Sequence, residues 1–402
     1  MKLFGNKLLG ATLLSVTAAA VLVACGGGDS TTPVAGGGPV GGGAPLAGGS
    51  PTTVASFSAA VATNIGATVI AGASTDEELY NIAANIGDSW QLVLNNKTNT
   101  YIMKVLVSQY GLTSTVEAPF TKTSDGTFTT IKSTNGTALN VQIDSRTKTL
   151  AGNATVGAKT ASMSGSGYNV TSTVSLAGTY FFLGAVRNVS NGQFPDNPAG
   201  SFSIASNGTD ITVCDNGIFV NGACVAVPNS GYATSTKLLK VRRDTANGLL
   251  RITDGVKDFG VLHVSAGDRG PVLILDRFGY NDENVLRAGV FFGGKAMKLA
   301  GTEFNGTFNC SINGLDSAVA VVTGTSYTVK NLVTARSGSG TLQYNKILSS
   351  NRQSAIDLDG AAIVQNNGEL LSQADLLLPL SSSLAVISHN DGTLDICRRT
   401  SL

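Results

Sequence analysis

This sequence contains little charge and, beyond its first residues, no long apolar run. Charged residues make up 13% of its 402 residues, well below the usual quarter. Its 27 Lys and Arg nearly cancel its 26 Asp and Glu, and 25 against 26 remain when Lys2 and Lys7 are set aside with the leader described below. Proteins that bind nucleic acids usually carry a cluster of Lys and Arg that contacts the phosphate backbone, and a balanced charge of this kind does not predict one. We therefore expect no nucleic-acid partner.

Residues that carry catalysis or bind metals are also scarce. His263 and His389 are the only histidines, and two separated histidines make a poor transition-metal site. The sequence has no Gly-x-Ser-x-Gly elbow and no Cys-x-x-Cys pair for zinc. Gly87-Asp88-Ser89-Trp90 resembles the nucleophile block of GDSL-type hydrolases, but the Asp-x-x-His that closes that family's site is missing. We predict no catalytic residue, no metal and no cofactor.

The N-terminal segment has the layout of a bacterial secretory leader. Lys2 and Lys7 give a basic start, and an apolar stretch leads into Leu22-Val23-Ala24-Cys25. This order resembles the lipobox of bacterial lipoproteins, in which the cysteine receives a diacylglyceryl group. The resemblance implies lipidation of Cys25, with palmitate as an acyl group, and a membrane anchor. Gly26 after the cysteine, in place of Asp, implies sorting to the outer membrane and leaves open which face the protein occupies.

The amino-acid composition divides the rest of the chain into a flexible tether and a folded part. The Gly- and Pro-rich segment that follows Cys25 has almost no charge and nothing large to bury, so it is expected to act as a flexible tether. The remainder exceeds what one hydrophobic core usually serves. We predict a signal peptide at 1–24, a tether at 25–52, a helix with a first β module at 53–174, a second β module with a disulfide loop at 175–297 and a third β module at 298–402.

One short helix is predicted near the N-terminus, at Asp76–Ile86. Thr75 and Glu78 have the spacing of a capping box, and the apolar positions between Leu79 and Ile86 form one stripe at helical spacing. The apolar segment Val54–Ala71 is rich in Ala, Thr and Gly and fits either a helix or a loop.

From Trp90 onward the pattern is β. Asn-Gly and Asp-Gly dipeptides recur between β-branched runs, and both tolerate the positive φ of tight hairpin turns. The sequence therefore predicts a mainly β protein of antiparallel, hairpin-rich modules, either sandwich or barrel-like.

Four cysteines remain besides Cys25, an even number that suggests two disulfides in an exported protein. Three pairings are possible. Turn residues between Cys214 and Cys224 favour that pair, which leaves Cys310 with Cys397. The loop between the first pair holds Ile218, Phe219 and Val220, which form either an apolar partner-binding tip or the core of a hairpin.

Taken together, these features favour a lipid-anchored cell-envelope protein with a non-enzymatic binding or adhesion role. The expected partners are the membrane, through the N-terminal lipid, and an unknown protein or glycan. Two alternatives stay open: an envelope hydrolase that acts on glycan or ester substrates through carboxylates, and a structural accessory of an outer-membrane complex.

Overall fold

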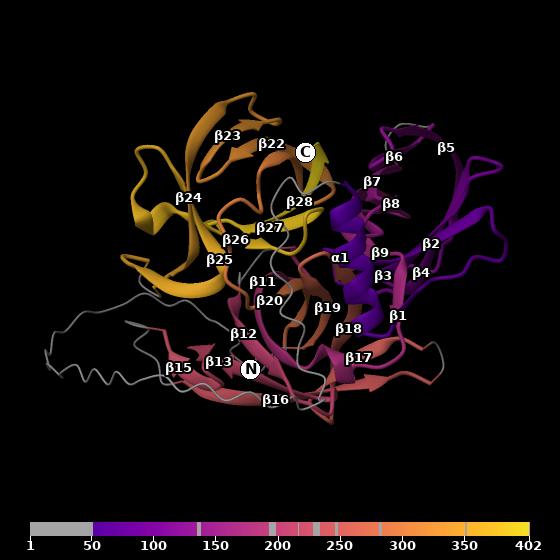
Figure 1. Cartoon of the computed structure of the whole chain (residues 1–402). Coiled ribbons are helices and arrows are strands. Elements are labelled where there is room, and N and C mark those ends of the chain that lie inside the picture. The colour runs from indigo at the N-terminus through magenta and orange to yellow at the C-terminus, as the bar shows by residue number, and fades with distance from the viewer. Residues whose placement is uncertain are drawn as a thin grey trace, which may run out of the picture.

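The computed structural model describes residues 51–134, 138–192, 198–215, 217–227, 234–245, 248–280, 284–349 and 352–401. The expected signal peptide, most of the expected tether and Cys25 lie outside the described residues. The described chain is mainly β, as the sequence predicts. It forms three closed barrels of eight antiparallel strands, and in each barrel the last strand pairs with the first (Figure 1).

The first barrel is a simple meander. Its strands are β2 (Glu77–Ala84), β3 (Asp88–Asn95), β4 (Thr100–Val107), β5 (Val116–Ser124), β6 (Phe128–Ser133), β7 (Leu139–Asp144), β8 (Thr149–Val156) and β9 (Lys159–Ser166).

The second barrel is a meander interrupted by one excursion. Its strands are β11 (Gly178–Asn188), β12 (Ala199–Ile204), β13 (Asp210–Asp215), β16 (Ser235–Arg243), β17 (Leu250–Thr253), β18 (Asp258–Gly267), β19 (Gly270–Tyr280) and β20 (Leu286–Lys295). The excursion is a separate hairpin of β14 (Gly217–Val220) and β15 (Ala223–Ala226).

The third barrel repeats the meander. Its strands are β21 (Gly306–Ile312), β22 (Leu315–Thr323), β23 (Ser326–Asn331), β24 (Ser337–Leu348), β25 (Ala355–Asn366), β26 (Asp375–Pro379), β27 (Leu384–Ser388) and β28 (Leu394–Ser401). Its first turn has positive φ at both Asn313 and Gly314, at 49° and 83°. This is the conformation for which Asn-Gly is selected in two-residue hairpin turns.

Helix α1 (Pro51–Asn64) and the pair of β1 (Ala67–Val69) and β10 (Tyr168–Val170) lie between the first two barrels. Helix α1 packs on β18, where Ser58 Oγ donates a hydrogen bond to the carbonyl of Ala266 (2.7 Å). Strand β1 pairs with β10, which follows the first barrel. Two single-turn 3-10 helices, η1 (Val174–Leu176) and η2 (Leu371–Gln373), complete the described elements. No described helix has the length and apolar character needed to cross a membrane.

The prediction of a helix at Asp76–Ile86 is wrong, because this segment contains β2. The single described α-helix, Pro51–Asn64, lies earlier and overlaps the segment Val54–Ala71, for which helix and loop both stay open in the sequence. The misleading apolar stripe arises because the C-terminal end of β2 is buried on both faces. Ile82 points into the first barrel, while Ala83 packs outward against the neighbouring barrels, and both are 0% exposed. Burial on both faces removes the alternation by which a strand is usually recognised.

The three barrels share an apolar cluster on their outer faces. It contains Ala83 and Ala151 of the first barrel, Phe181 and Phe292 of the second and Leu378 of the third. Strands that contribute to it carry apolar side chains in succession, since one residue faces the barrel interior and the next faces a neighbouring barrel. Sequence runs that are apolar without alternation therefore mark the surfaces where barrels meet.

Two disulfides occupy different structural positions. Cys310 and Cys397 are directly opposite each other on β21 and β28, the two strands that close the third barrel. Cys214 and Cys224 link β13 to β15 and so tie the hairpin to the second barrel. Both pairs are those favoured from the sequence.

Candidate functional site

The lumen of the third barrel contains a cavity of about 440 Å³. This volume lies within the range of small-molecule sites, which hold about 300–1,000 Å³. Alternate residues of each strand point into the barrel, so the wall is built from every second side chain. The lining side chains are Phe304, Phe308, Cys310, Ile312, Ser317, Ala318, Ala320, Val322, Tyr327, Val329, Asn331, Val333, Leu342, Val364, Asn366, Asp375, Leu377, Ile387, His389, Asp391, Thr393, Asp395 and Cys397.

One end of this lumen is apolar and aromatic. The rings of Phe304 and Phe308 stack with their centres 4.9 Å apart, and both side chains are buried. The Cys310–Cys397 disulfide lies beside them in the wall. The apolar part of a ligand can displace water from this end. Burial of apolar surface is the main source of affinity in pockets of this kind.

The other end carries a histidine held between two carboxylates. Nδ1 of His389 is 2.8 Å from Asp375 Oδ2, and Nε2 is 3.1 Å from Asp395 Oδ2. Asp395 also accepts a hydrogen bond from the hydroxyl of Ser317 (3.0 Å). Both ring nitrogens can donate at once only when the imidazole carries two protons.

The charge at this end follows from that geometry. Burial alone would lower the pKa of His389, but the hydrogen bonds to Asp375 and Asp395 outweigh it and raise the pKa to about 10. The imidazolium therefore offsets one negative charge. Asp375, Asp395 and Asp391 all line the cavity, and no Lys or Arg stands among the described lining residues. Negative charge consequently predominates at the polar end.

A second polar cluster brings together a serine, a histidine and an aspartate, but it lacks the geometry of a hydrolase site. Ser89 of β3 contacts His263 of β18 through Nε2 (3.0 Å), and the same Nε2 lies 2.9 Å from Asp276 Oδ2 on β19. Ser89 Oγ also donates directly to Asp276. In a catalytic triad the serine and the aspartate engage different ring nitrogens. All three side chains are buried where the first barrel meets the second, so a substrate has no approach.

Burial of the Asp276 carboxylate in this cluster is electrostatically unfavourable. Burial raises the pKa of Asp276 to about 6, and the neighbouring His263 opposes the rise. Within the described residues, Asp276 Oδ1 is buried without a hydrogen-bond partner. The cluster thus joins two barrels through polar contacts and presents no accessible nucleophile.

The other residues singled out from the sequence are placed as follows. Ile218 is 3% exposed and belongs to the apolar cluster shared by the barrels, whereas Val220 is 43% exposed. Ile218 is thus buried, as in the hairpin-core alternative, and a partner-binding role for this loop stays a prediction. Phe219 is half-buried, and its backbone N–H donates to Ser201 Oγ (2.6 Å). Lipidation of Cys25 falls outside the described residues, and the described chain contains no metal-binding group of three or more His, Cys, Asp or Glu.

Sequence reasoning missed the polar end of the third barrel. In the sequence His389 stands out only as one of two separated histidines, and no pattern there singles out Asp375 or Asp395. These residues are separated by 14 and 6 positions from the histidine. Alternation along β26 and β28 is the one sequence signal that could have placed both aspartates on the lumen face.

No family model matches this sequence, and no curated protein matches it. Among solved structures, a mutant of the vaccine antigen transferrin-binding protein B from Haemophilus parasuis is similar over 80% of this chain and 66% of that chain, with 7% identity and a TM-score of 0.19. Intact Ap-TbpB, with its N and C lobes, is similar over 78% of this chain and 67% of that chain, with 10% identity and a TM-score of 0.16. This chain thus spans just under two thirds of the Haemophilus parasuis protein.

Proposed function

We propose that this protein is a non-enzymatic binding protein of the bacterial cell envelope, anchored to the outer membrane by lipid on Cys25, and that the third barrel holds a small amphipathic cation. The anchor rests on the resemblance of Leu22-Val23-Ala24-Cys25 to a lipobox. The ligand class rests on the third-barrel lumen.

The single observation that carries the ligand class is the pairing of an apolar wall with an acidic end in one cavity. An apolar body would lie against Phe304 and Phe308, and a cationic head would lie beside Asp375, Asp391 and Asp395. An anionic head would face a surplus of carboxylates at short range, where an effective dielectric constant well below that of water strengthens repulsion.

A binding role is favoured over hydrolysis at this site by the state of its histidine. A general base needs an unprotonated nitrogen near neutral pH. His389 has both nitrogens engaged by carboxylates and holds its proton well above pH 7. His389 is therefore not available as a general base, and its charged ring is suited to holding Asp375 and Asp395 in place around a bound molecule.

Isothermal titration calorimetry with three six-carbon probes tests the proposal: hexylammonium, hexan-1-ol and hexanoate. The probes share one tail, so any difference reports the head group. We expect hexylammonium to bind at least tenfold more tightly to the third barrel than the other two. Equal binding of hexan-1-ol and hexylammonium there would show that the carboxylates do not select the ligand, and no saturable binding of hexylammonium would overturn the proposal.

Two neighbouring positions on β22 provide the matched control. Ala320 lines the lumen, while Val321 points outward and is 45% exposed. Ala320→Trp should fill the cavity and weaken hexylammonium binding at least tenfold, and Val321→Trp should leave it unchanged. If Ala320→Trp binds the probe as tightly as the parent protein does, the site lies elsewhere.

A further inference from the structure

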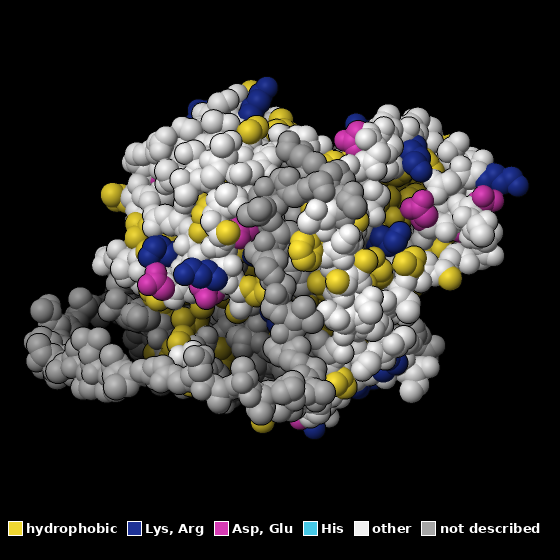
Figure 2. Space-filling view, in the orientation of Figure 1, with side chains coloured by type: hydrophobic (Ala, Val, Ile, Leu, Met, Phe, Trp, Pro, Cys, Tyr) yellow, Lys and Arg dark blue, Asp and Glu magenta, His cyan; other side chains and the backbone are white. Residues whose placement is uncertain are grey.

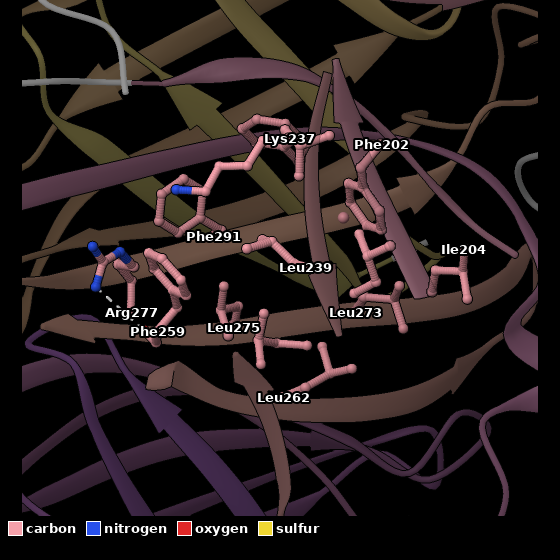
Figure 3. A pocket seen from close by; sticks show the side chains of 15 residues that line it. Phe202, Ile204, Lys237, Leu239, Phe259, Leu262, Leu273, Leu275, Arg277 and Phe291 are labelled. Atoms are coloured by element: carbon pink, nitrogen blue, oxygen red, sulfur yellow. Dashed lines mark hydrogen bonds between the residues drawn. The ribbon is translucent and has the colours of Figure 1, made fainter. Parts of the chain in front are cut away.

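The second barrel has a lumen of opposite character. Its cavity is smaller, about 110 Å³, and its lining is almost entirely apolar. Figure 3 shows the wall, with Phe202, Ile204 and Leu273 toward one end and Arg277 and Lys237 toward the other. Asp and Glu are absent from the described residues that line it.

The arrangement of this lumen follows from strand alternation. On β19, Leu273, Leu275 and Arg277 are two positions apart and share the inner face, so a guanidinium follows two leucines along one wall. On β16, Lys237 and Leu239 follow the same rule. The two cations therefore lie at one end of the lumen, while α1 and β10 contribute to the buried cluster at the other.

Both cations approach the same aromatic ring. The Lys237 ammonium lies 4.7 Å and the Arg277 guanidinium carbon 5.0 Å from the centre of the Phe259 ring. The Arg277 side chain is 5% exposed, and among the described residues its hydrogen bonds go only to the carbonyls of Phe259 and Phe278. Burial and the nearby Arg287 lower the pKa of Arg277 to about 10. No carboxylate of the described residues hydrogen-bonds this buried guanidinium, an unfavourable arrangement that an anion would relieve.

The apolar part of the lumen leaves surface for a ligand. Phe202, Val213, Leu239, Leu275 and Phe291 face the lumen and remain only partly buried. The cavity is comparable to apolar cavities of roughly 150 Å³ that accept benzene-sized molecules. Its size favours a short chain or a single ring over a long acyl chain.

We propose that the lumen of the second barrel binds a small organic anion, a carboxylate with an apolar body, whose head group contacts Arg277 and Lys237. A carboxylate can accept two parallel hydrogen bonds from a guanidinium, which suits Arg277 as the orienting group. The inference goes beyond the proposed function because it concerns another barrel and a ligand of opposite charge.

The same six-carbon probes test this site independently of the third barrel. We expect hexanoate to bind in the second barrel at least tenfold more tightly than hexan-1-ol, and hexylammonium not to bind there. Lys237→Gln and Arg277→Gln should each weaken hexanoate binding about tenfold or more. Equal binding of hexanoate and hexan-1-ol, or no saturable binding of hexanoate, would overturn the proposal.

A second pair of variants keeps the test informative if Arg277→Gln fails to fold. Leu239→Trp fills the lumen without altering either cation, and Leu238→Trp changes the neighbouring side chain, which is 69% exposed on the outer face. Hexanoate binding should be lost in Leu239→Trp and kept in Leu238→Trp and Ala320→Trp. Loss of hexanoate binding in Ala320→Trp alone would assign it to the third barrel and contradict the proposal.

Discussion

His389 shows how one side chain can link a binding site to stability. Its imidazole contacts a carboxylate through each ring nitrogen, and its side chain is 29% exposed. Protonation completes both hydrogen bonds, so the folded state holds the proton more tightly than an unfolded chain does. The same contacts that shape the polar end of the lumen therefore also stabilise the third barrel at acidic and neutral pH.

The pH dependence of stability should reveal this contact. The folded pKa of His389 is raised from 6.5 to about 10, so the stabilisation is complete below pH 6.5 and is lost as pH rises through 10. After allowance for partial solvent screening, the loss is on the order of 3 kcal/mol. Urea unfolding of the ligand-free protein between pH 6 and pH 10 measures it.

His389→Gln provides the control for that measurement. Glutamine retains an amide donor near the carboxylates but does not titrate, so the variant should lose less stability than the parent protein across the same pH interval. Parallel curves for the two proteins would contradict the role given to His389.

At the level of elements, sequence reasoning identified the fold class but misplaced one element. The alternation and turn dipeptides that predict antiparallel β modules come from local chemistry, as at Asn313-Gly314, where the turn itself needs positive φ. Barrel closure depends on pairing between distant strands, as between β21 and β28, and no local pattern encodes it. The same limit concealed the candidate site, because Asp375 and Asp395 meet His389 only once β26, β27 and β28 are in register.

The disulfide at the seam of the third barrel should stabilise more than the one in the hairpin. Cys310 and Cys397 are 87 residues apart and join the strands that close the barrel, whereas Cys214 and Cys224 are 10 apart. In the chain-entropy model, a loop of the longer kind contributes about 4–5 kcal/mol and one of the shorter kind about 3 kcal/mol.

Two double variants measure the difference. Urea unfolding of Cys310→Ser with Cys397→Ser should show the larger loss, and Cys214→Ser with Cys224→Ser the smaller. A larger loss from the hairpin pair would contradict the ranking that the loop lengths predict.

For the whole molecule, the main structural question is whether three closed barrels behave as one body. Buried polar contacts join them in pairs. Ser383 of the third barrel contacts Thr147 and Asp144 of the first (2.7 Å each), and the Ser382 hydroxyl donates to Asp268 of the second (2.6 Å). Figure 2 shows charged side chains in small, separated groups on the visible face, without one dominant basic area. Apolar packing, buried hydrogen bonds to the carboxylates of Asp144 and Asp268, and the buried Arg269–Glu303 ion pair (3.9 Å) therefore hold the barrels together.

The shared apolar cluster leads to a prediction about cooperativity. Phe292 is 0% exposed and packs outward in that cluster, while its neighbour Phe291 faces the lumen of the second barrel. Phe292→Ala should cost about 3–5 kcal/mol, as burial of a large side chain predicts. It should also speed amide hydrogen exchange in β8 and β27, which belong to the other two barrels. Phe291→Ala should affect exchange mainly within the second barrel, because its side chain faces that barrel's lumen and packs on Phe182. If Phe292→Ala also leaves the amide exchange rates of β8 and β27 unchanged, the three barrels open independently. The outer-face cluster would then hold the barrels in position without coupling their stability.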